Sequence, residues 1–355
     1  MAATSVRTEF QFQFKSKPLL LSKDRGRSGS SSKGSFDGQV LDLGWHEPIG
    51  VEHISKVVGH CHRMCIEISP SMFHHHHHDM IFVEIIVKEK ILQDLVREVN
   101  AAASLAKVKR EEINDKKPRS RICPYCSSTV LLSDLVESPQ IYCRYCEAIF
   151  PRSGLILYDE KDMRLCNRCG FYSKPELFCY RLNMKKRHRI LCKGCEQEKA
   201  RRVCCVNSLT LLGLPSAIML MYKAHQVQDL PSLLEELDRA NTFVKKCDTA
   251  SVTEAMKIYK GILQSSDNGV NAGIRYNLGM AYIALGDNAN AIVAFKASLE
   301  DCCNYEPAAG MLLDCYRDMG AGASPKVAEL RRQFGWEGSE MNTRRSLRKV
   351  FFDIK

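Results

Sequence analysis

The chain has 355 residues, a net charge of +10 and an apolar content of 45%, which is enough for two or three compact units with real cores. The positive charge is concentrated in residues 116–205, which hold nineteen Lys or Arg against nine Asp or Glu. Attraction to phosphate or to an anionic membrane face would therefore come from this segment, although a solvated basic surface has the same composition. Eight of the seventeen cysteines form four Cys-x-x-Cys pairs, a spacing that favours metal binding in a reducing, intracellular compartment over a secreted disulfide framework.

Residues 1–80 are predicted to be largely disordered. Gly and Ser dominate residues 24–38, which leaves too few apolar side chains for a core. Residues 1–36 carry seven Lys or Arg and eight Ser, with Glu9 and Asp24 as the acidic residues. This bias is typical of transit segments for plastids or other organelles, and also of plain disordered tails. The His- and Cys-rich stretch 60–78 lacks a two-plus-two ligand spacing and is not predicted to be a metal site.

Residues 81–117 are predicted to form one long amphipathic helix. Apolar residues recur at helical intervals from Ile85 to Leu105, and charged residues lie between them. Pro118 ends the helix before the cysteine-rich region. Such a helix packs either on another part of the chain or on a partner helix.

Residues 118–155 contain the first two Cys-x-x-Cys motifs. Sixteen residues separate them, enough for a β-hairpin that brings the second pair of thiolates opposite the first around a tetrahedral zinc ion. The spacing resembles that of zinc ribbons, although Ser127 stands where many ribbons have glycine after the first pair. The predicted ligands are Cys123, Cys126, Cys143 and Cys146.

Residues 163–202 contain the other two motifs, separated by twenty-two residues, and the second of them leads into a predicted helix. The residues Cys169-Gly170, Lys174-Pro175, Phe178, the basic loop 185–189 and Cys192-Lys193 resemble the treble-clef zinc modules that often precede HNH nucleases. No His-Asn-His constellation follows, so the resemblance does not imply nuclease activity. The predicted ligands are Cys166, Cys169, Cys192 and Cys195.

Four cysteine ligands close each predicted tetrahedron and leave no position for a water molecule, so both zinc ions are expected to be structural. Two zinc ions per chain are therefore predicted. No Ser-His-Asp set, phosphate-binding glycine loop or paired-carboxylate motif occurs in a convincing frame. We accordingly expect the protein not to be an enzyme.

The basic residues of the second module are suited to phosphate. The candidate contacts are Lys185, Lys186, Arg187, Arg189, Arg201 and Arg202. Aromatic residues lie among these charges and serve either base stacking or the small core of a zinc module. They are Tyr142, Tyr145, Phe171, Tyr172 and Tyr180. Nucleic-acid binding is one interpretation, and a solvated or membrane-facing basic surface is the other.

Residues 203–222 contain no charged side chain. As a helix the segment would extend about 30 Å, enough to cross the hydrocarbon core of a membrane. Asn207, Thr210 and Pro215 make it less apolar than most spans, and a buried helix between two domains has a similar composition. Both interpretations stay open. For a single-pass span, the excess of Lys and Arg before the segment would place the zinc modules on the cytosolic or stromal-like side.

Residues 228–336 show a 34-residue period, because Leu278, Tyr282 and Gly286 recur as Leu312, Tyr316 and Gly320. The unit around residues 275–298 closely resembles the tetratricopeptide repeat (TPR), a pair of packed helices. The resemblance implies about three stacked helix pairs with a groove for a peptide or helix of another protein, or an array that only stabilises its own chain. The residues assigned to packing are Leu278, Gly279, Tyr282, Ala291, Phe295, Leu312 and Tyr316.

Residues 337–355 form a basic tail that either caps the repeats or contacts an anionic surface. The features together predict a mainly α protein with TPR-like helical repeats, two small β-rich zinc modules and a disordered N-terminus. The favoured function is a non-enzymatic zinc-binding adaptor or scaffold whose repeats bind a protein partner, anchored to a membrane if residues 203–222 span it. The alternative is a nucleic-acid-binding protein, in which the basic zinc modules bind RNA or DNA and the repeats recruit partners.

Overall fold

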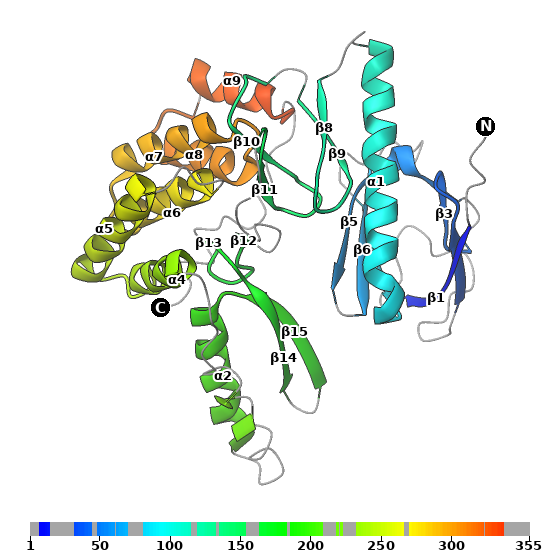
Figure 1. The fold of residues 1–355 in the computed structure, drawn as a ribbon, viewed down its shortest axis with the longest axis horizontal. Helices are drawn as coiled ribbons and strands as arrows, with labels where there is room; N and C mark the ends of the chain where they lie inside the picture. Colours follow the sequence, from blue (N-terminus) through cyan, green and yellow to red (C-terminus); the bar gives the residue numbers. More distant parts are fainter. Residues whose placement is uncertain are drawn as a thin grey trace. The chain divides into compact units, whose positions relative to one another are not determined.

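The computed structural model combines helices with an antiparallel sheet, so the fold is mixed α/β and the prediction of a mainly α protein is wrong (Figure 1). The chain divides into two compact units, Met1–Ser133 and Asp134–Lys355. The structure describes residues 7–14, 32–44, 48–60, 62–69, 81–114, 119–132, 135–153, 163–182, 185–208, 218–219, 221–222, 232–265, 270–322 and 324–336.

The first unit contains a seven-stranded antiparallel sheet with the strand order β4-β3-β2-β1-β7-β6-β5. Its strands are β1 (Thr8–Phe14), β2 (Ser32–Phe36), β3 (Val40–Asp42), β4 (Ile49–Gly50), β5 (Ile54–His60), β6 (Arg63–Ile68) and β7 (Ile81–Val87). A 3-10 turn, Val51–His53, separates β4 from β5. The described part of residues 1–80 is thus largely β-structure, and the prediction of disorder is wrong there.

Short strands with alternating burial explain this difference. In β1, Phe10 and Phe12 are buried while Glu9 and Gln11 are exposed, which is the two-residue period of a strand with one face on a core. The strand has neighbours from distant parts of the chain, since it pairs with β2 on one side and with β7 on the other. The pattern within one strand does not show which other strands lie beside it, and a sheet becomes stable only when several strands pair.

The long helix α1 (Glu89–Asn114) packs on this sheet through apolar residues such as Leu92, Leu95 and Val99. A Cβ atom at Gly59 of β5 would lie 2.6 Å from Val96, so glycine allows the close approach. The predicted helix 81–117 begins later than expected, because residues 81–87 form β7. Val83, Ile85 and Val87 are buried at every second position, and a strand rather than a helix satisfies that pattern.

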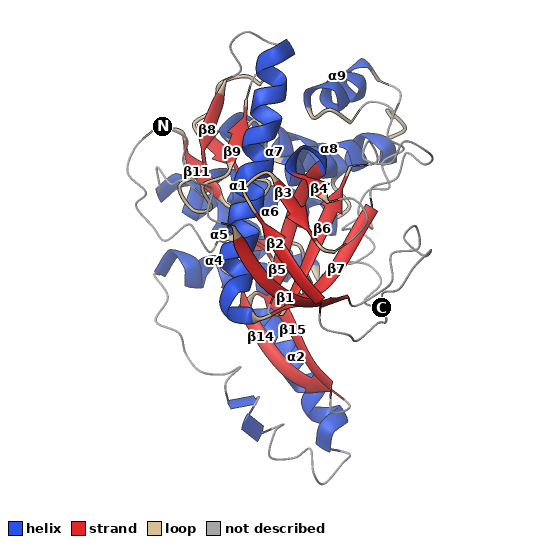
Figure 2. Ribbon diagram, turned by 90° about the vertical axis from the view of Figure 1, so that its right-hand side faces the viewer, coloured by secondary structure: helices blue, strands red, loops and turns tan. Residues whose placement is uncertain are grey.

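Small hairpins carry the cysteine motifs. Their strands are β8 (Ser120–Ile122) with β9 (Thr129–Leu131), β10 (Gln140–Tyr142) with β11 (Ile149–Pro151), β12 (Arg164–Leu165) with β13 (Tyr172–Ser173), and β14 (Glu176–Leu182) with β15 (Lys185–Leu191). Helix α2 (Lys193–Ser208) follows the last hairpin and lies beside it (Figure 2). These elements cover the predicted zinc ribbon 118–155 and treble-clef-like module 163–202.

Helices fill the described part of residues 228–336. They are α4 (Ser232–Val244), α5 (Thr249–Ser265), α6 (Asn271–Ala284), α7 (Asn288–Asp301), α8 (Glu306–Asp318) and α9 (Pro325–Gln333), and each packs against the next one along the chain. Gly286 and Gly320, one period apart, follow α6 and α8 with φ of 77° and 74°. Glycine recurs at this place because it takes the left-handed conformation that ends a helix without steric cost.

The residues predicted to pack between the helices belong to the helical core. Gly279 of α6 lies against the ring of Phe295 of α7, and a Cβ atom there would lie 2.6 Å from a ring carbon. The glycine therefore sets how closely α6 and α7 approach. Ala291, Phe295, Leu312 and Tyr316 are buried, and Leu278 and Tyr282 are partly buried against the same core.

Several predicted segments are described only in part or not at all. Residues 203–208 form the end of α2, whereas 209–217 and 220 lie outside the described residues. Among the residues that the structure does describe, no helix combines the length and the apolar character that crossing a bilayer requires. The His run 74–78, the stretch 15–31 of the candidate transit segment and the basic tail 337–355 also lie outside the described residues.

Candidate metal centres

Three of the four Cys-x-x-Cys motifs form the same tight turn between the strands of a hairpin. In each, the residue after the second cysteine donates its N–H to the carbonyl of the first. The N···O distances are 3.0 Å for Ser127 to Cys123, 2.7 Å for Glu147 to Cys143 and 2.9 Å for Gly170 to Cys166. Such a turn directs both thiols to one side of the hairpin, where they can share a metal ion.

The donating residue takes a left-handed backbone conformation in all three turns. Its φ is 62° at Ser127, 64° at Glu147 and 72° at Gly170. Only the third turn uses glycine, for which this conformation carries no steric cost. Ser127, a departure from the ribbon pattern, thus adopts the turn geometry that glycine usually provides.

The fourth motif differs because it begins a helix. The N–H of Glu196 donates to the Cys192 carbonyl at 2.9 Å, which is the first turn of α2. Both thiols of this motif therefore lie at a helix N-terminus, where unpaired N–H groups and the helix dipole stabilise thiolates. The N–H of Cys192 also donates to the Sγ of Cys166 at 3.3 Å, which ties the two motifs together.

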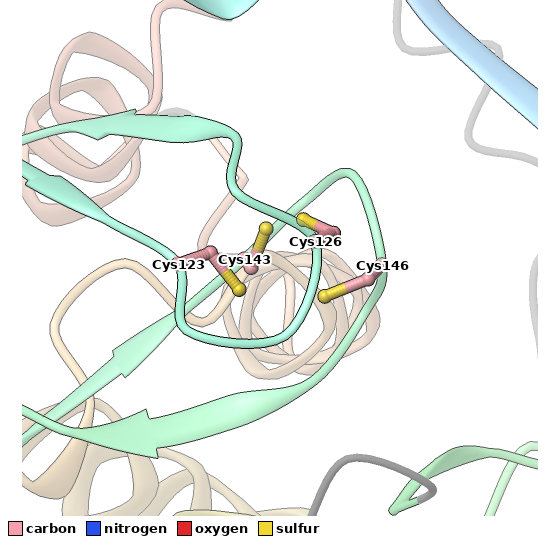
Figure 3. A group of neighbouring side chains, drawn as sticks. All are labelled: Cys123, Cys126, Cys143 and Cys146. Atoms are coloured by element: carbon pink, nitrogen blue, oxygen red, sulfur yellow. The ribbon is translucent and has the colours of Figure 1, made fainter. Parts of the chain in front are cut away.

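The eight predicted ligands lie in two clusters of four, and the sulfur atoms within each cluster lie within 4.8 Å of one another. Figure 3 shows the four side chains of the first cluster, Cys123, Cys126, Cys143 and Cys146, turned toward a common centre. In a tetrahedral site with zinc–sulfur bonds of about 2.3 Å, neighbouring sulfurs lie about 3.8 Å apart. The Sγ atoms of Cys169 and Cys192 in the second cluster are 3.6 Å apart. The clusters fit two structural zinc ions, as predicted.

The two clusters differ in burial. In the first, Cys123 and Cys143 are buried and Cys126 and Cys146 are half-buried, whereas all four cysteines of the second are buried. The second cluster is also part of the hydrophobic core that the helices α4 to α9 share. Cys123 and Cys143 are buried outside that core.

Lys245, just after α4, contacts the second cluster. Its Nζ donates to the Sγ of Cys192 at 3.6 Å and to that of Cys195 at 3.5 Å. Burial lowers the pKa of Lys245, but the surrounding thiolates raise it more, so the net pKa is raised and the side chain is an ammonium ion. Four thiolates around Zn²⁺ leave two negative charges, one of which Lys245 balances. Sequence reasoning missed this residue, because it lies fifty positions after Cys195 in another element.

Asp238 of α4 lies near the same cluster. Burial raises the pKa of its carboxyl to about 6, although Lys245 opposes the shift. The carboxylate and the thiolates are both anionic and repel each other. The positive charge of Lys245 offsets this repulsion. A Cβ atom at Gly194, between the ligands Cys192 and Cys195, would lie 2.8 Å from Nζ, and glycine therefore leaves room for the ammonium group.

Asparagine side chains in the helical region bind the backbone of two strands of the second unit. Tyr172 of β13 donates its N–H to Oδ1 of Asn277, and Nδ2 of Asn277 donates to the Tyr172 carbonyl, both at 2.8 Å. Asn304, in the turn before α8, makes the same pair of bonds to Tyr142 of β10, at 2.8 and 2.7 Å. The helical array is therefore bound to two strands that lie beside zinc ligands.

The candidate phosphate contacts are only partly placed. Arg189 on β15 and Arg201 and Arg202 on α2 are exposed, and Arg202 pairs with Glu198 at 2.8 Å. Lys185, Lys186 and Arg187 lie in β15, but their side chains are outside the described part. The aromatic residues proposed for base stacking are all buried. Their exposed fractions are 7% for Tyr142, 9% for Tyr145, 0% for Phe171, 1% for Tyr172 and 5% for Tyr180, so they form the cores of the modules.

No family model matches the chain, and a search of the curated proteins found no match. The resemblances to zinc ribbons, treble clefs and TPRs therefore rest on the residues and geometry described above.

Proposed function

We propose that this protein is a non-enzymatic adaptor, in which TPR-like helix pairs and two zinc modules form a rigid scaffold for a protein partner. The observation that carries the proposal is the closed, all-cysteine composition of both clusters together with the burial of the second in the helical core. A zinc ion with four thiolate ligands has no position for substrate or water. The metal therefore stabilises a binding surface instead of performing chemistry.

The TPR-like character is supported by local packing. Gly279 brings α6 and α7 together at Phe295, and Gly286 and Gly320 end α6 and α8 at the same place in the 34-residue period. Helix pairs that repeat in this way cannot bury their apolar faces alone and are stable only as a stack. Stacked pairs of this kind usually serve to bind other proteins.

An apolar hollow favours a protein as the partner. It has a volume of about 700 Å³ and is lined by Val136, Glu137, Lys296, Leu299, Glu300, Cys303, Leu312, Tyr316, Pro325, Lys326, Glu329, Leu330, Arg332 and Gln333. Its lining combines apolar and charged side chains, the two kinds of residue that form the core and the polar margin of a protein interface. Because asparagines of α4 and α6 bind the second zinc module, we place the partner at this hollow rather than at that face.

Affinity capture with two matched variants tests the adaptor function. We expect zinc-loaded wild-type protein to capture a defined set of proteins that survives nuclease and detergent. Leu299→Lys, which puts a charge into the hollow, should abolish the capture. Val293→Lys on the same helix should retain it, because Val293 is 63% exposed and lies outside the hollow. If both variants still capture the proteins, the partner does not bind at this hollow and the proposal is wrong.

A second function, nucleic-acid binding, is favoured by the β14–β15 hairpin. The two strands pair over seven residues, lie beside α2 and extend away from the helices α4 to α9 (Figure 2), and β15 contains four of the candidate basic residues. Because the neighbouring aromatics are buried, binding would rely on phosphate contacts and show little sequence preference. Its affinity should fall steeply with salt.

A charge-removal variant separates the two functions. Replacing Lys185, Lys186, Arg187 and Arg189 by Gln should abolish binding to RNA or DNA while leaving two zinc ions per chain and the nuclease-resistant capture unchanged. Wild-type protein that binds no nucleic acid at low salt would eliminate the second function.

A further inference from the structure

The last helix of the array, α9, does not keep the 34-residue period in its packing. The buried residues of α7 are Ala291, Ala294, Phe295 and Ser298. The residues one period later are all exposed in α9: Pro325, Ala328, Glu329 and Arg332. Helix α9 instead buries Val327 and Leu330, whose counterparts in α7, Val293 and Lys296, are exposed. At about 100° per residue, α9 thus buries the side of the helix opposite to the one that α7 buries.

The residues of the third helix pair, α8 and α9, explain this change of side. In the preceding pair the ring of Phe295 packs on Gly279, whereas Leu313, with its buried side chain, takes the place of that glycine in α8. Glu329 takes the place of Phe295, and its side chain is 64% exposed. Helix α9 also begins 37 residues after the start of α7 instead of 34, at Pro325. It therefore cannot pack on α8 as α7 packs on α6.

The hollow assigned to the partner lies where α9 meets α7 and α8 in this irregular way. Its lining residues on the two outer helices recur at intervals of three or four, so each set forms one stripe of a helix. The stripe of α7 is Lys296, Leu299 and Glu300, and that of α9 is Lys326, Glu329, Leu330 and Gln333. Helix α8 contributes Leu312 and Tyr316, one turn apart. Helices pack on one another through such stripes, so the hollow has the form of a groove for a further helix.

The chemistry of the lining favours a helix over an extended chain. A helix satisfies its own backbone N–H and C=O groups, whereas an extended segment needs hydrogen-bond partners that apolar side chains do not supply. The apolar part of the lining includes Leu299, Leu312, Tyr316 and Leu330. Val136 also lines the hollow and is 77% exposed, so this side is open to a chain and does not enclose a small molecule.

The charges of the lining are balanced. Three of its residues are acidic and three are basic: Glu137, Glu300, Glu329, Lys296, Lys326 and Arg332. Balanced charge gives no general attraction to phosphate and matches a segment that carries both signs beside its apolar residues.

We propose that the hollow binds one amphipathic helix of a partner protein, which packs a narrow apolar stripe against α7, α8 and α9 and completes the irregular third helix pair. The inference rests on the proposed adaptor function and specifies the chemistry of the partner. Its apolar residues recur at intervals of three and four, with acidic and basic residues on both sides. Because the lining charges balance, the affinity should depend little on salt, in contrast to nucleic-acid binding at the β14–β15 hairpin.

Filling the hollow from within tests the proposed geometry in the full zinc-loaded chain. Glu329→Phe places a ring at the hollow, and Ala328→Phe is the matched control, because Ala328 is exposed and outside the lining. Relative to the control, Glu329→Phe should raise the melting temperature by about 2 °C or more through the added apolar contact. It should also reduce capture of the partner proteins at least tenfold, whereas the control should capture like wild type.

The capture results separate this inference from the adaptor function. If Leu299→Lys abolishes capture while Glu329→Phe captures like wild type, the inference is wrong and the adaptor function stands. If all these variants capture like wild type, the adaptor function at the hollow is wrong as well. Should Glu329→Phe fail to hold two zinc ions, Glu300→Phe decides in its place, since it reaches the same hollow from α7.

Photo-cross-linking identifies the occupant of the hollow. Benzoylphenylalanine in place of Val136 should cross-link to segments of captured proteins that have apolar residues at intervals of three and four. A labelled synthetic peptide of such a segment should bind the zinc-loaded chain and lose at least tenfold in affinity with a central proline, which breaks a helix. Cross-links to an extended Pro- or Gly-rich segment, to a second copy of this chain or to its own residues 337–355 overturn the proposal. A peptide that tolerates the proline, or the absence of any cross-link, also overturns it.

Discussion

The two zinc clusters are built from similar local parts and differ in what surrounds them. The first joins two hairpin turns, and half of its cysteines are partly exposed. The second joins one hairpin turn to a helix N-terminus, is buried throughout, and has the ammonium group of Lys245 against two of its sulfurs. Its cysteines also belong to the core shared with the helices. A local motif thus fixes the ligand geometry, whereas the surroundings decide how much of the fold depends on the metal.

The largest expected effect is the loss of zinc from the second cluster. Apparent binding free energies of structural zinc, about 10–16 kcal/mol, are as large as the whole stability of a typical domain, about 5–15 kcal/mol. Cys169→Ser should therefore abolish the cooperative thermal unfolding of the helices. Cys146→Ser should also lose one zinc ion, yet keep most of the helical unfolding transition, because the first cluster's cysteines lie outside that core. Circular dichroism measures the unfolding transition of the helices, and metal analysis measures the zinc content. If the two variants lose the transition equally, the two clusters do not differ in how much the helices depend on them.

The next effect concerns how the helices hold the second zinc module. Gly273→Ala places a methyl group into the ring of Tyr172, which is itself buried. Overpacking of this kind typically lowers the free energy of unfolding by about 1–3 kcal/mol. Gly310→Ala on α8 meets open space and should instead stabilise by up to about 1 kcal/mol through helix propensity. Urea denaturation of both variants gives the comparison, and a neutral Gly273→Ala would show that the ring moves aside freely.

Lys245 provides a test of the second cluster alone. Lys245→Met keeps the length of the side chain and removes the charge that faces Cys192 and Cys195. Loss of a partner that contacts metal ligands typically weakens metal binding by about 10–100-fold. Competition with a chromogenic chelator should therefore show one zinc ion leaving more readily while the other is unchanged. Lys246→Met is the control, since Lys246 is exposed and lies over the ring of Phe243. Identical zinc release from the two variants would assign Lys245 no part in the site.

The zinc clusters and the helices were accessible to sequence reasoning because their signals are local. Two cysteines separated by two residues already define one side of a tetrahedron, and Leu278 and Leu312 mark a period along a single stretch of chain. The left-handed turn at Ser127 was within reach too, since the residue's place after the second cysteine requires it.

The remaining features depend on contacts between distant residues. The sheet is completed by pairing of Phe12 with Val87, and neither β1 nor β7 shows by itself that the other exists. Asn277 bonds to Tyr172, which lies 105 positions away in the sequence. A single asparagine in a helix belongs to no spacing pattern from which its hydrogen-bond partner could be predicted.

The smallest expected effect separates the turns of the two clusters. Glu147 and Gly170 hold the same place in their turns, with φ of 64° and 72°, but only glycine takes this conformation at no cost. Glu147→Gly should raise the free energy of unfolding by about 1 kcal/mol, and Gly170→Ala should lower it by a similar amount. Chemical denaturation in excess zinc measures both. If Glu147→Gly is destabilising, a contact of the glutamate side chain outweighs the backbone strain. Strain in this turn would then not be what limits the stability of the first zinc cluster.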